Sequence, residues 1–142
     1  MNVETILQSK DDRMATVPAD ATVEVALARL KEEGIGALVV SGDGQALEGI
    51  ISERDIVRGL VDHGAALLGM AVAEIMTKEV TCCAAADSVD DVMAVMTENR
   101  IRHLPILEDG KLKAIISIGD VVKARLTALQ HEADALREYI AT

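Results

Sequence analysis

The sequence has almost no aromatic residues: among its 142 residues there is no phenylalanine, no tryptophan and a single tyrosine. It therefore lacks the aromatic platform on which the bases of a single-stranded nucleic acid stack. Basic residues are also outnumbered, with 14 against 24 acidic ones, and the net charge of -10 opposes contact with a phosphate backbone. We therefore expect no nucleic-acid partner.

Cysteines and long apolar runs are equally scarce. The two cysteines, Cys82 and Cys83, are adjacent and so cannot join distant segments. No apolar stretch reaches the roughly 18 residues that a membrane-spanning helix needs. The N-terminus lacks the basic start and the apolar core of a secretory signal. These features predict a reduced, cytoplasmic protein with no membrane partner.

An internal repeat organises the chain. A shift of 66 residues places 20–44 on 86–110, and a shift of 65 places 47–58 on 112–123. Thirteen of the 37 paired positions are identical, and most of the others keep their polarity. One repeat, at about 50 residues, is too small to bury a stable core alone, so two copies are expected to pack together.

Both copies show the same order of local patterns. A helix with apolar residues at i, i+3, i+4 and i+7 is followed by two apolar runs across a Gly/Asp turn, which indicates a hairpin, and then by a second helix. Short strands at 14–17 and 80–83 are expected before the two helices. The predicted fold class is α+β, with two β-α-β-β-α units packed sheet to sheet about a pseudo-twofold axis. The expected boundaries are an N-terminal segment at 1–12, repeat one at 13–63, a linker at 64–78, repeat two at 79–127 and a helical extension at 128–142.

The last helix is expected to continue beyond the second repeat. Its apolar residues are spaced 4, 3, 4, 3 and 4 apart, a seam typical of helix pairing: Val122, Leu126, Leu129, Ala133, Leu136 and Ile140. This seam can be covered by a second copy of the chain, or the helix can fold back onto its own domain. We predict a homodimer, because the seam runs past the repeat that would otherwise bury it.

A tetrad present in both copies is the strongest candidate for a binding site. Ser52 and Asp55 in the first copy, and Ser117 and Asp120 in the second, follow an Ile-Ile strand end and begin a helix. Helix N-termini carry free N–H groups and partial positive charge, which suit a phosphate, and the aspartate can accept hydrogen bonds from vicinal hydroxyls. The spacing therefore suits a ribose phosphate. It is also the spacing of a capping box, which needs no ligand.

These motifs resemble those of a tandem pair of CBS domains, the family named for cystathionine β-synthase. The resemblance covers about residues 13–128 and depends on Gly49-Ile50-Ile51-Ser52-x-x-Asp55, Ile115-Ile116-Ser117-x-x-Asp120 and Arg102-His103-Leu104-Pro105-Ile106. Ala114 departs from the pattern, because the family usually has glycine there. The resemblance implies a Bateman module, whose clefts between the repeats bind adenine nucleotides or related adenosyl compounds.

The same resemblance implies the residues of two clefts. The first, here named the Asp120 cleft, would be formed by Ala15, Thr16, Arg102, His103, Ser117 and Asp120. The second, the Asp55 cleft, would be formed by Gly36, Ala37, Ser52, Asp55, Thr77, Val80 and Thr81. Arg102 supplies a cation where its counterpart Gly36 cannot, which favours the Asp120 cleft for an anionic ligand.

The expected function is a regulatory binding module that senses AMP, ATP, NAD or a related adenosyl ligand and needs no cofactor. Its output would be a change in its own dimer or in a separate effector protein. The alternative is a purely structural dimerisation module, in which the tetrads only cap helices. An enzyme is not expected, because the sequence shows neither a metal-ligand set nor a nucleophile–base pair.

Overall fold

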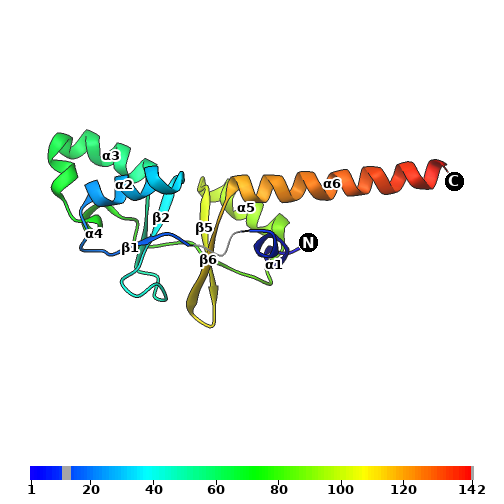
Figure 1. Cartoon of the computed structure of the whole chain (residues 1–142), viewed down its shortest axis with the longest axis horizontal. Coiled ribbons are helices and arrows are strands. Elements are labelled where there is room, and N and C mark those ends of the chain that lie inside the picture. The colour runs from blue at the N-terminus through cyan, green and yellow to red at the C-terminus, as the bar shows by residue number, and fades with distance from the viewer. Residues whose placement is uncertain (11–13, 142) are drawn as a thin grey trace.

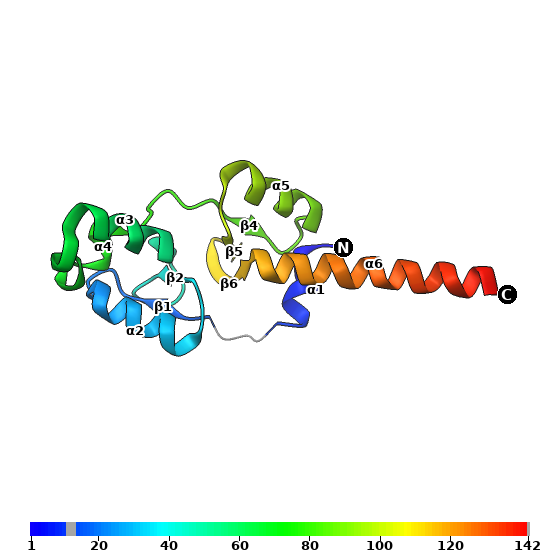
Figure 2. The same ribbon diagram turned by 90° about the horizontal axis from the view of Figure 1, so that it is seen from above.

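The computed structural model describes residues 1–10 and 14–141, which form two similar halves (Figures 1 and 2). The first half contains β1 (Thr16–Val17), α2 (Val23–Glu33), β2 (Ala37–Val40), β3 (Gly49–Ser52) and α3 (Glu53–His63). The second contains β4 (Cys83–Ala84), α5 (Val89–Asn99), β5 (His103–Glu108), β6 (Lys111–Ser117) and α6 (Ile118–Ala141). The helix α1 (Val3–Gln8) precedes the first half, and the 3-10 helix η1 (Gly64–Gly69) and α4 (Val72–Ile75) connect the two. The predicted α+β class and the β-α-β-β-α order are confirmed.

Each half has a three-stranded sheet of the same topology. The strand orders are β1-β2-β3 and β4-β5-β6; in each sheet the first two strands are parallel and the last two form an antiparallel hairpin. Gly44 and Gly110 end the two hairpin turns at φ of 76° and 77°, a conformation that disfavours residues with a side chain. The two turns are therefore equivalent, although one is a residue shorter.

The helices begin where the capping chemistry predicts. Thr22 Oγ1 accepts a hydrogen bond from the backbone N–H of Val25, and Ser88 Oγ accepts one from that of Asp91. The helix α2 ends at Gly34, which is left-handed at φ 64°. Its counterpart at the end of α5 is Arg100, also left-handed at φ 53°. The two helices therefore end with the same backbone conformation, although the residue differs.

The two halves have separate hydrophobic cores, and each core includes a helix from outside its own repeat. Leu67 of η1 and Val72 of α4 are buried in the first core. Val3 and Ile6 of α1 are buried in the second core, although α1 is joined in sequence to the first half. The segment 1–10 therefore lies against the second half, and Lys10 at its end is held near the start of α6.

The helix α6 is 24 residues long and extends well beyond the second half (Figure 1). Val121, near its start, is buried in the second core. The seam positions that follow are exposed by between 44% and 81%: Val122, Leu126, Leu129, Leu136 and Ile140. The helix does not fold back over its own domain, so this seam is open to a partner. Among the described residues, no helix combines the length and the apolarity needed to cross a membrane.

Candidate functional site

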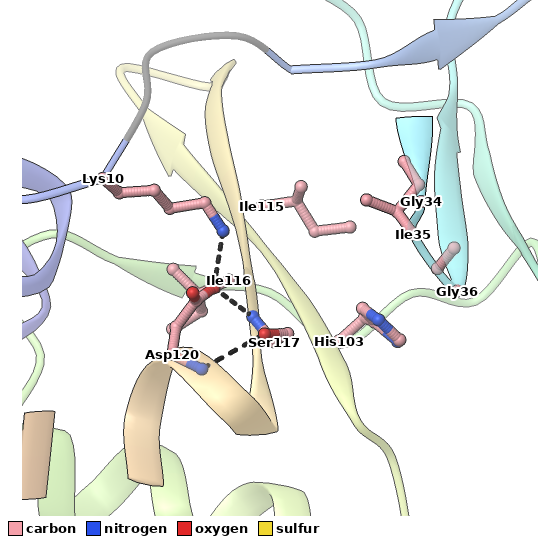
Figure 3. A pocket seen from close by; sticks show the side chains of 10 residues that line it. Lys10, Gly34, Ile35, Gly36, His103, Ile115, Ile116, Ser117 and Asp120 are labelled. Atoms are coloured by element: carbon pink, nitrogen blue, oxygen red, sulfur yellow. Dashed lines mark hydrogen bonds and ion pairs between the residues drawn. The ribbon is translucent and has the colours of Figure 1, made fainter. Parts of the chain in front are cut away.

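A cavity of about 340 Å³ lies between the two halves, beside the start of α6 (Figure 3). One wall is formed by residues 34–37, where α2 ends and β2 begins. The facing wall comes from the second half and from the N-terminal segment: Lys10, His103, Ile115, Ile116, Ser117 and Asp120. The volume falls at the lower end of the range of about 300–1,000 Å³ that is typical of small-molecule sites. The cavity therefore suits a single ligand of nucleoside size.

Asp120 is fixed by hydrogen bonds at the start of α6. The backbone N–H of Ser117 donates to Asp120 Oδ2 at 2.8 Å, and the N–H of Asp120 donates to Ser117 Oγ at 3.2 Å. Lys10 Nζ donates to the same carboxylate oxygen (Figure 3). Burial acts to raise the pKa of Asp120, but the hydrogen bonds from Lys10 and Ser117 outweigh burial and lower the pKa below its usual value. The side chain is therefore an ionised acceptor at neutral pH.

His103 occupies the side of the cavity where the two halves meet. A Cβ added at Gly36 would lie 3.4 Å from Cε1 of His103 and 3.5 Å from Oε1 of Glu53, at ordinary contact distance, so His103 of the second half and Glu53 of α3 both lie next to Gly36. Burial lowers the pKa of His103, and this effect exceeds the opposing influence of the Glu53 and Asp120 carboxylates. The imidazole is therefore neutral at neutral pH, with one donor and one acceptor nitrogen.

The half-buried His103 is expected to make the folded chain less stable as the pH falls below about 6.5. In the unfolded chain a histidine titrates near pH 6.5, and in the folded chain its pKa is lower. As the pH falls, the unfolded chain takes up a proton that the folded chain does not, and unfolding is favoured. Urea midpoints at about pH 7.5 and about pH 5.5 would measure this loss. His103→Gln should reduce this loss of stability. His131→Gln, on the exposed part of α6, should leave the loss unchanged. An equal loss in His103→Gln and in the unmodified chain would contradict the prediction.

The Asp55 tetrad forms the same cap in the first half. The backbone N–H of Ser52 donates to Asp55 Oδ2 at 2.9 Å, and the N–H of Asp55 donates to Ser52 Oγ at 3.3 Å. Thr77 Oγ1 donates to Asp55 Oδ1 at 3.1 Å. Thr77 is held there because its backbone pairs with that of Ile50 in β3. Three residues that were predicted for the Asp55 cleft are thus brought together.

The cation of the cavity comes from a segment that the sequence did not indicate. Arg102, directly before β5, has an exposed side chain, and its carbonyl accepts a hydrogen bond from the N–H of Ile118. Lys10 lines the cavity instead, 110 positions before Asp120 in the sequence. Its place depends on the packing of α1 against the second core, and no local motif around Lys10 marks that contact.

The other predicted site residues are spread over both halves. Gly36 and Ala37, predicted for the Asp55 cleft, line the cavity that contains Asp120. Eight predicted residues are not among those that line this cavity: the three around the Asp55 cap, Ser52, Asp55 and Thr77, and also Ala15, Thr16, Val80, Thr81 and Arg102. Ala15 packs against the first core and Thr16 belongs to β1, whereas Val80 is half-buried and Thr81 is exposed.

The two cysteines are free thiols in the second half, close to β4. Burial raises the pKa of Cys83 to about 11, helped by the nearby charge of Asp87. Cys83 is therefore protonated at neutral pH, which is the wrong state for a nucleophile. No group of three or more histidine, cysteine, aspartate or glutamate side chains in the described parts of the chain is placed to hold a metal ion.

Comparison with known families agrees with this architecture. The model of the CBS domain matches residues 7–62 and again residues 72–127. The chain therefore belongs to the CBS domain family and contains a tandem pair of these domains, as the sequence motifs predicted.

A known relative from a plant is longer than this chain. CBSX3, a mitochondrial CBS domain-containing protein of Arabidopsis thaliana, is 36% identical over 137 residues, which are 94% of this chain and 66% of the plant protein. The chain thus spans just under two thirds of that relative. Because the relative is described as mitochondrial, the cytoplasmic location of this chain stays a prediction.

Solved structures show the same fold. The CBS-domain containing protein ATU1752 from Agrobacterium tumefaciens is 41% identical, with a TM-score of 0.85 over 88% of this chain and 99% of that one. The CBS domain pair of protein MJ0100 was solved in complex with 5′-methylthioadenosine and S-adenosyl-L-methionine. It is 22% identical, with a TM-score of 0.77 over 87% of this chain and 98% of that one, and it shares the fold alone.

Proposed function

We propose that the chain is a regulatory module that binds an adenosyl ligand in the cavity between its two halves. The observation that carries the proposal is the ionised Asp120, fixed by its cap to Ser117 in the wall of a cavity of about 340 Å³. A fixed carboxylate is a suitable acceptor for the two hydroxyls of a ribose, and Lys10 is a suitable partner for a phosphate. The two adenosyl compounds found with the MJ0100 pair support this class of ligand. We propose AMP, ATP and NAD as candidates, because each carries phosphate.

A purely structural dimerisation module remains the alternative function. Both Ser-x-x-Asp tetrads do form reciprocal caps, so capping alone does not distinguish the two functions. A capping box is complete without any further partner. Each aspartate nevertheless has one, Lys10 on Asp120 and Thr77 on Asp55, and the cavity lies beside Asp120. The cavity beside Asp120, lined by a cation as well as by the carboxylate, favours a binding role over capping alone.

Calorimetric titration of the full chain with AMP, ATP, NAD and S-adenosyl-L-methionine tests the proposed function, with GMP as the control for the base. Saturable binding of at least one adenosyl compound is expected. Thermal unfolding should then shift upward, since a ligand at about 100 times its Kd stabilises the folded state by about 2.7 kcal/mol. Absence of heat and of any shift at millimolar ligand, in a chain that is still a dimer, would support the structural alternative. Steady release of phosphate or adenosine would reveal an enzyme instead.

We further propose that two copies of the chain pair through α6 in parallel. The exposed seam supplies the apolar contact, and the charges beside it favour this direction. Heptad spacing places Glu132 of one copy beside Arg137 of a parallel second copy. An antiparallel pair with the same core layers would place Glu132 against Glu132 and Lys123 against Arg137. The dimer then provides a route by which binding in the cavity changes the arrangement of two modules.

Shortening the chain to end at Thr127 is expected to convert the dimer into a monomer, because most of the seam is removed while Val121 stays in the second core. Sedimentation equilibrium measures the change. The double variant Leu129→Glu, Leu136→Glu should dissociate as well, since it places charge in the seam. Its matched control is Thr127→Glu, Ala135→Glu, which adds the same charge on the opposite side of α6 and should stay dimeric. A shortened chain that is still a dimer would show that α6 is not the interface.

A further inference from the structure

We infer that Lys10 makes the cavity select phosphorylated adenosyl ligands over neutral ones. The inference rests on the proposed function and concerns the same site. Lys10 Nζ donates to Asp120 Oδ2, the oxygen that also accepts the N–H of Ser117 at 2.8 Å. The cation thus already occupies the carboxylate that would bind the ribose (Figure 3).

Ribose binding has to disturb this ion pair. A vicinal diol that donates two hydrogen bonds to a carboxylate uses both of its oxygens, so it competes with Lys10 for Oδ2. The side chains of Lys10 and Asp120 are only 27% and 28% exposed, so water replaces a lost partner incompletely. A neutral nucleoside displaces the ammonium and offers it no counter-ion. A ligand with a phosphate supplies a new counter-ion at the same moment, which makes the exchange favourable.

The remaining charges near the cavity make Lys10 decisive. Glu53 lies beside His103 and Gly36, and Arg102 acts on His103 from outside the cavity wall. With Lys10 present, the two acidic groups Asp120 and Glu53 are balanced by Lys10 and Arg102. Without Lys10, negative charge exceeds positive charge around the cavity, and a phosphate is repelled. Lys10 is therefore the group whose removal changes the preferred class of ligand.

The test compares AMP with adenosine, which share the base and the ribose and differ in the phosphate. Calorimetry on the full chain should show tighter binding of AMP by about tenfold or more, the gain expected of a charge-assisted contact. Lys10→Met should reduce this ratio by about tenfold or more. In this variant the phosphate of AMP has no ammonium group to pair with. Adenosine, in contrast, no longer has to displace Lys10 from Asp120. Lys10→Arg keeps the charge and should retain most of the preference.

Lys111→Met is the matched control, because it removes the same charge from an exposed lysine at the start of β6 and should leave the ratio unchanged. The AMP and adenosine affinities are measured on the same variant, so a general effect of the substitution on folding cancels in their ratio. Lys10→Gln provides a second neutral variant. Equal binding of AMP and adenosine by the unmodified chain, or an unchanged ratio in Lys10→Met, would overturn the inference and leave the proposed function standing. Binding of neither compound, together with no binding of ATP, NAD or S-adenosyl-L-methionine, would instead refute the proposed function.

Discussion

Leu38→Ala is expected to lower the free energy of unfolding by about 2–5 kcal/mol. Leu38 lies in β2, the middle strand of the first sheet, and its side chain is 0% exposed within the first core. Alanine would remove its contacts and leave a cavity that the surrounding strands and helices cannot fill. Leu104 is its counterpart in β5, also 0% exposed, within the second core. Leu104→Ala is therefore expected to cause a loss of the same size.

Urea unfolding followed by circular dichroism measures both variants. Leu68→Ala is the control, because Leu68 is 40% exposed in η1 and should change the unfolding free energy by less than about 1 kcal/mol. The segment 1–10 is joined to the first half and packs on the second, so we expect the two cores to unfold in one transition. Two separate transitions in Leu38→Ala would show that the halves unfold independently. A loss below about 1 kcal/mol in both core variants would contradict the packing described for the two cores.

Local chemistry explains why most of the fold could be predicted from the sequence. The caps at Thr22 and Ser88 and the left-handed Gly44 and Gly110 each act within a few residues, so a single segment of sequence contains the whole signal. The duplication then provides each signal twice. The strand expected at 80–83 is found at Cys83–Ala84, because its position is set by pairing with β5 far along the chain.

Long-range packing explains what the sequence did not reveal. The helices α1 and α4 have six and four residues, too few for a periodic pattern, and their stability comes from the cores on which they pack. Nothing local specifies that α1 lies on the second half. The position of Lys10 follows from that packing, so the cation of the cavity was predicted at Arg102 while Lys10 went unnoticed.

One departure between the repeats also has a physical reason in the structure. A Cβ at Gly49 would lie 2.7 Å from Met76 Sδ and 2.8 Å from the carbonyl oxygen of Thr77, too close for any side chain. The segment after α4 thus requires glycine in β3. Its counterpart Ala114 pairs with Ile106 in the β5–β6 hairpin and packs against the second core, where a methyl group is accommodated.

Asp120→Ala is expected to weaken binding of AMP by about tenfold or more, because a hydrogen bond to a charged acceptor contributes about 1.5–3 kcal/mol. The substitution also removes the hydrogen bond from the N–H of Ser117 to the carboxylate, one of the two bonds of the cap on α6, which costs stability of about 1 kcal/mol. Asp55→Ala is the matched control for this second effect, since Asp55 makes the same reciprocal cap with Ser52 at the start of α3.

The two variants separate the capping role of the tetrads from their binding role. Both should lower the urea midpoint by similar amounts, because each removes the same hydrogen bond of the cap and one further partner, Lys10 on Asp120 or Thr77 on Asp55. The larger loss of AMP affinity is expected in Asp120→Ala, whose carboxylate lines the cavity together with Lys10 and His103. Equal destabilisation with unchanged AMP affinity in Asp120→Ala would mean that the tetrads act as helix caps alone. A tenfold loss in Asp120→Ala beside a small loss in Asp55→Ala would place the ribose at the start of α6 rather than at the start of α3.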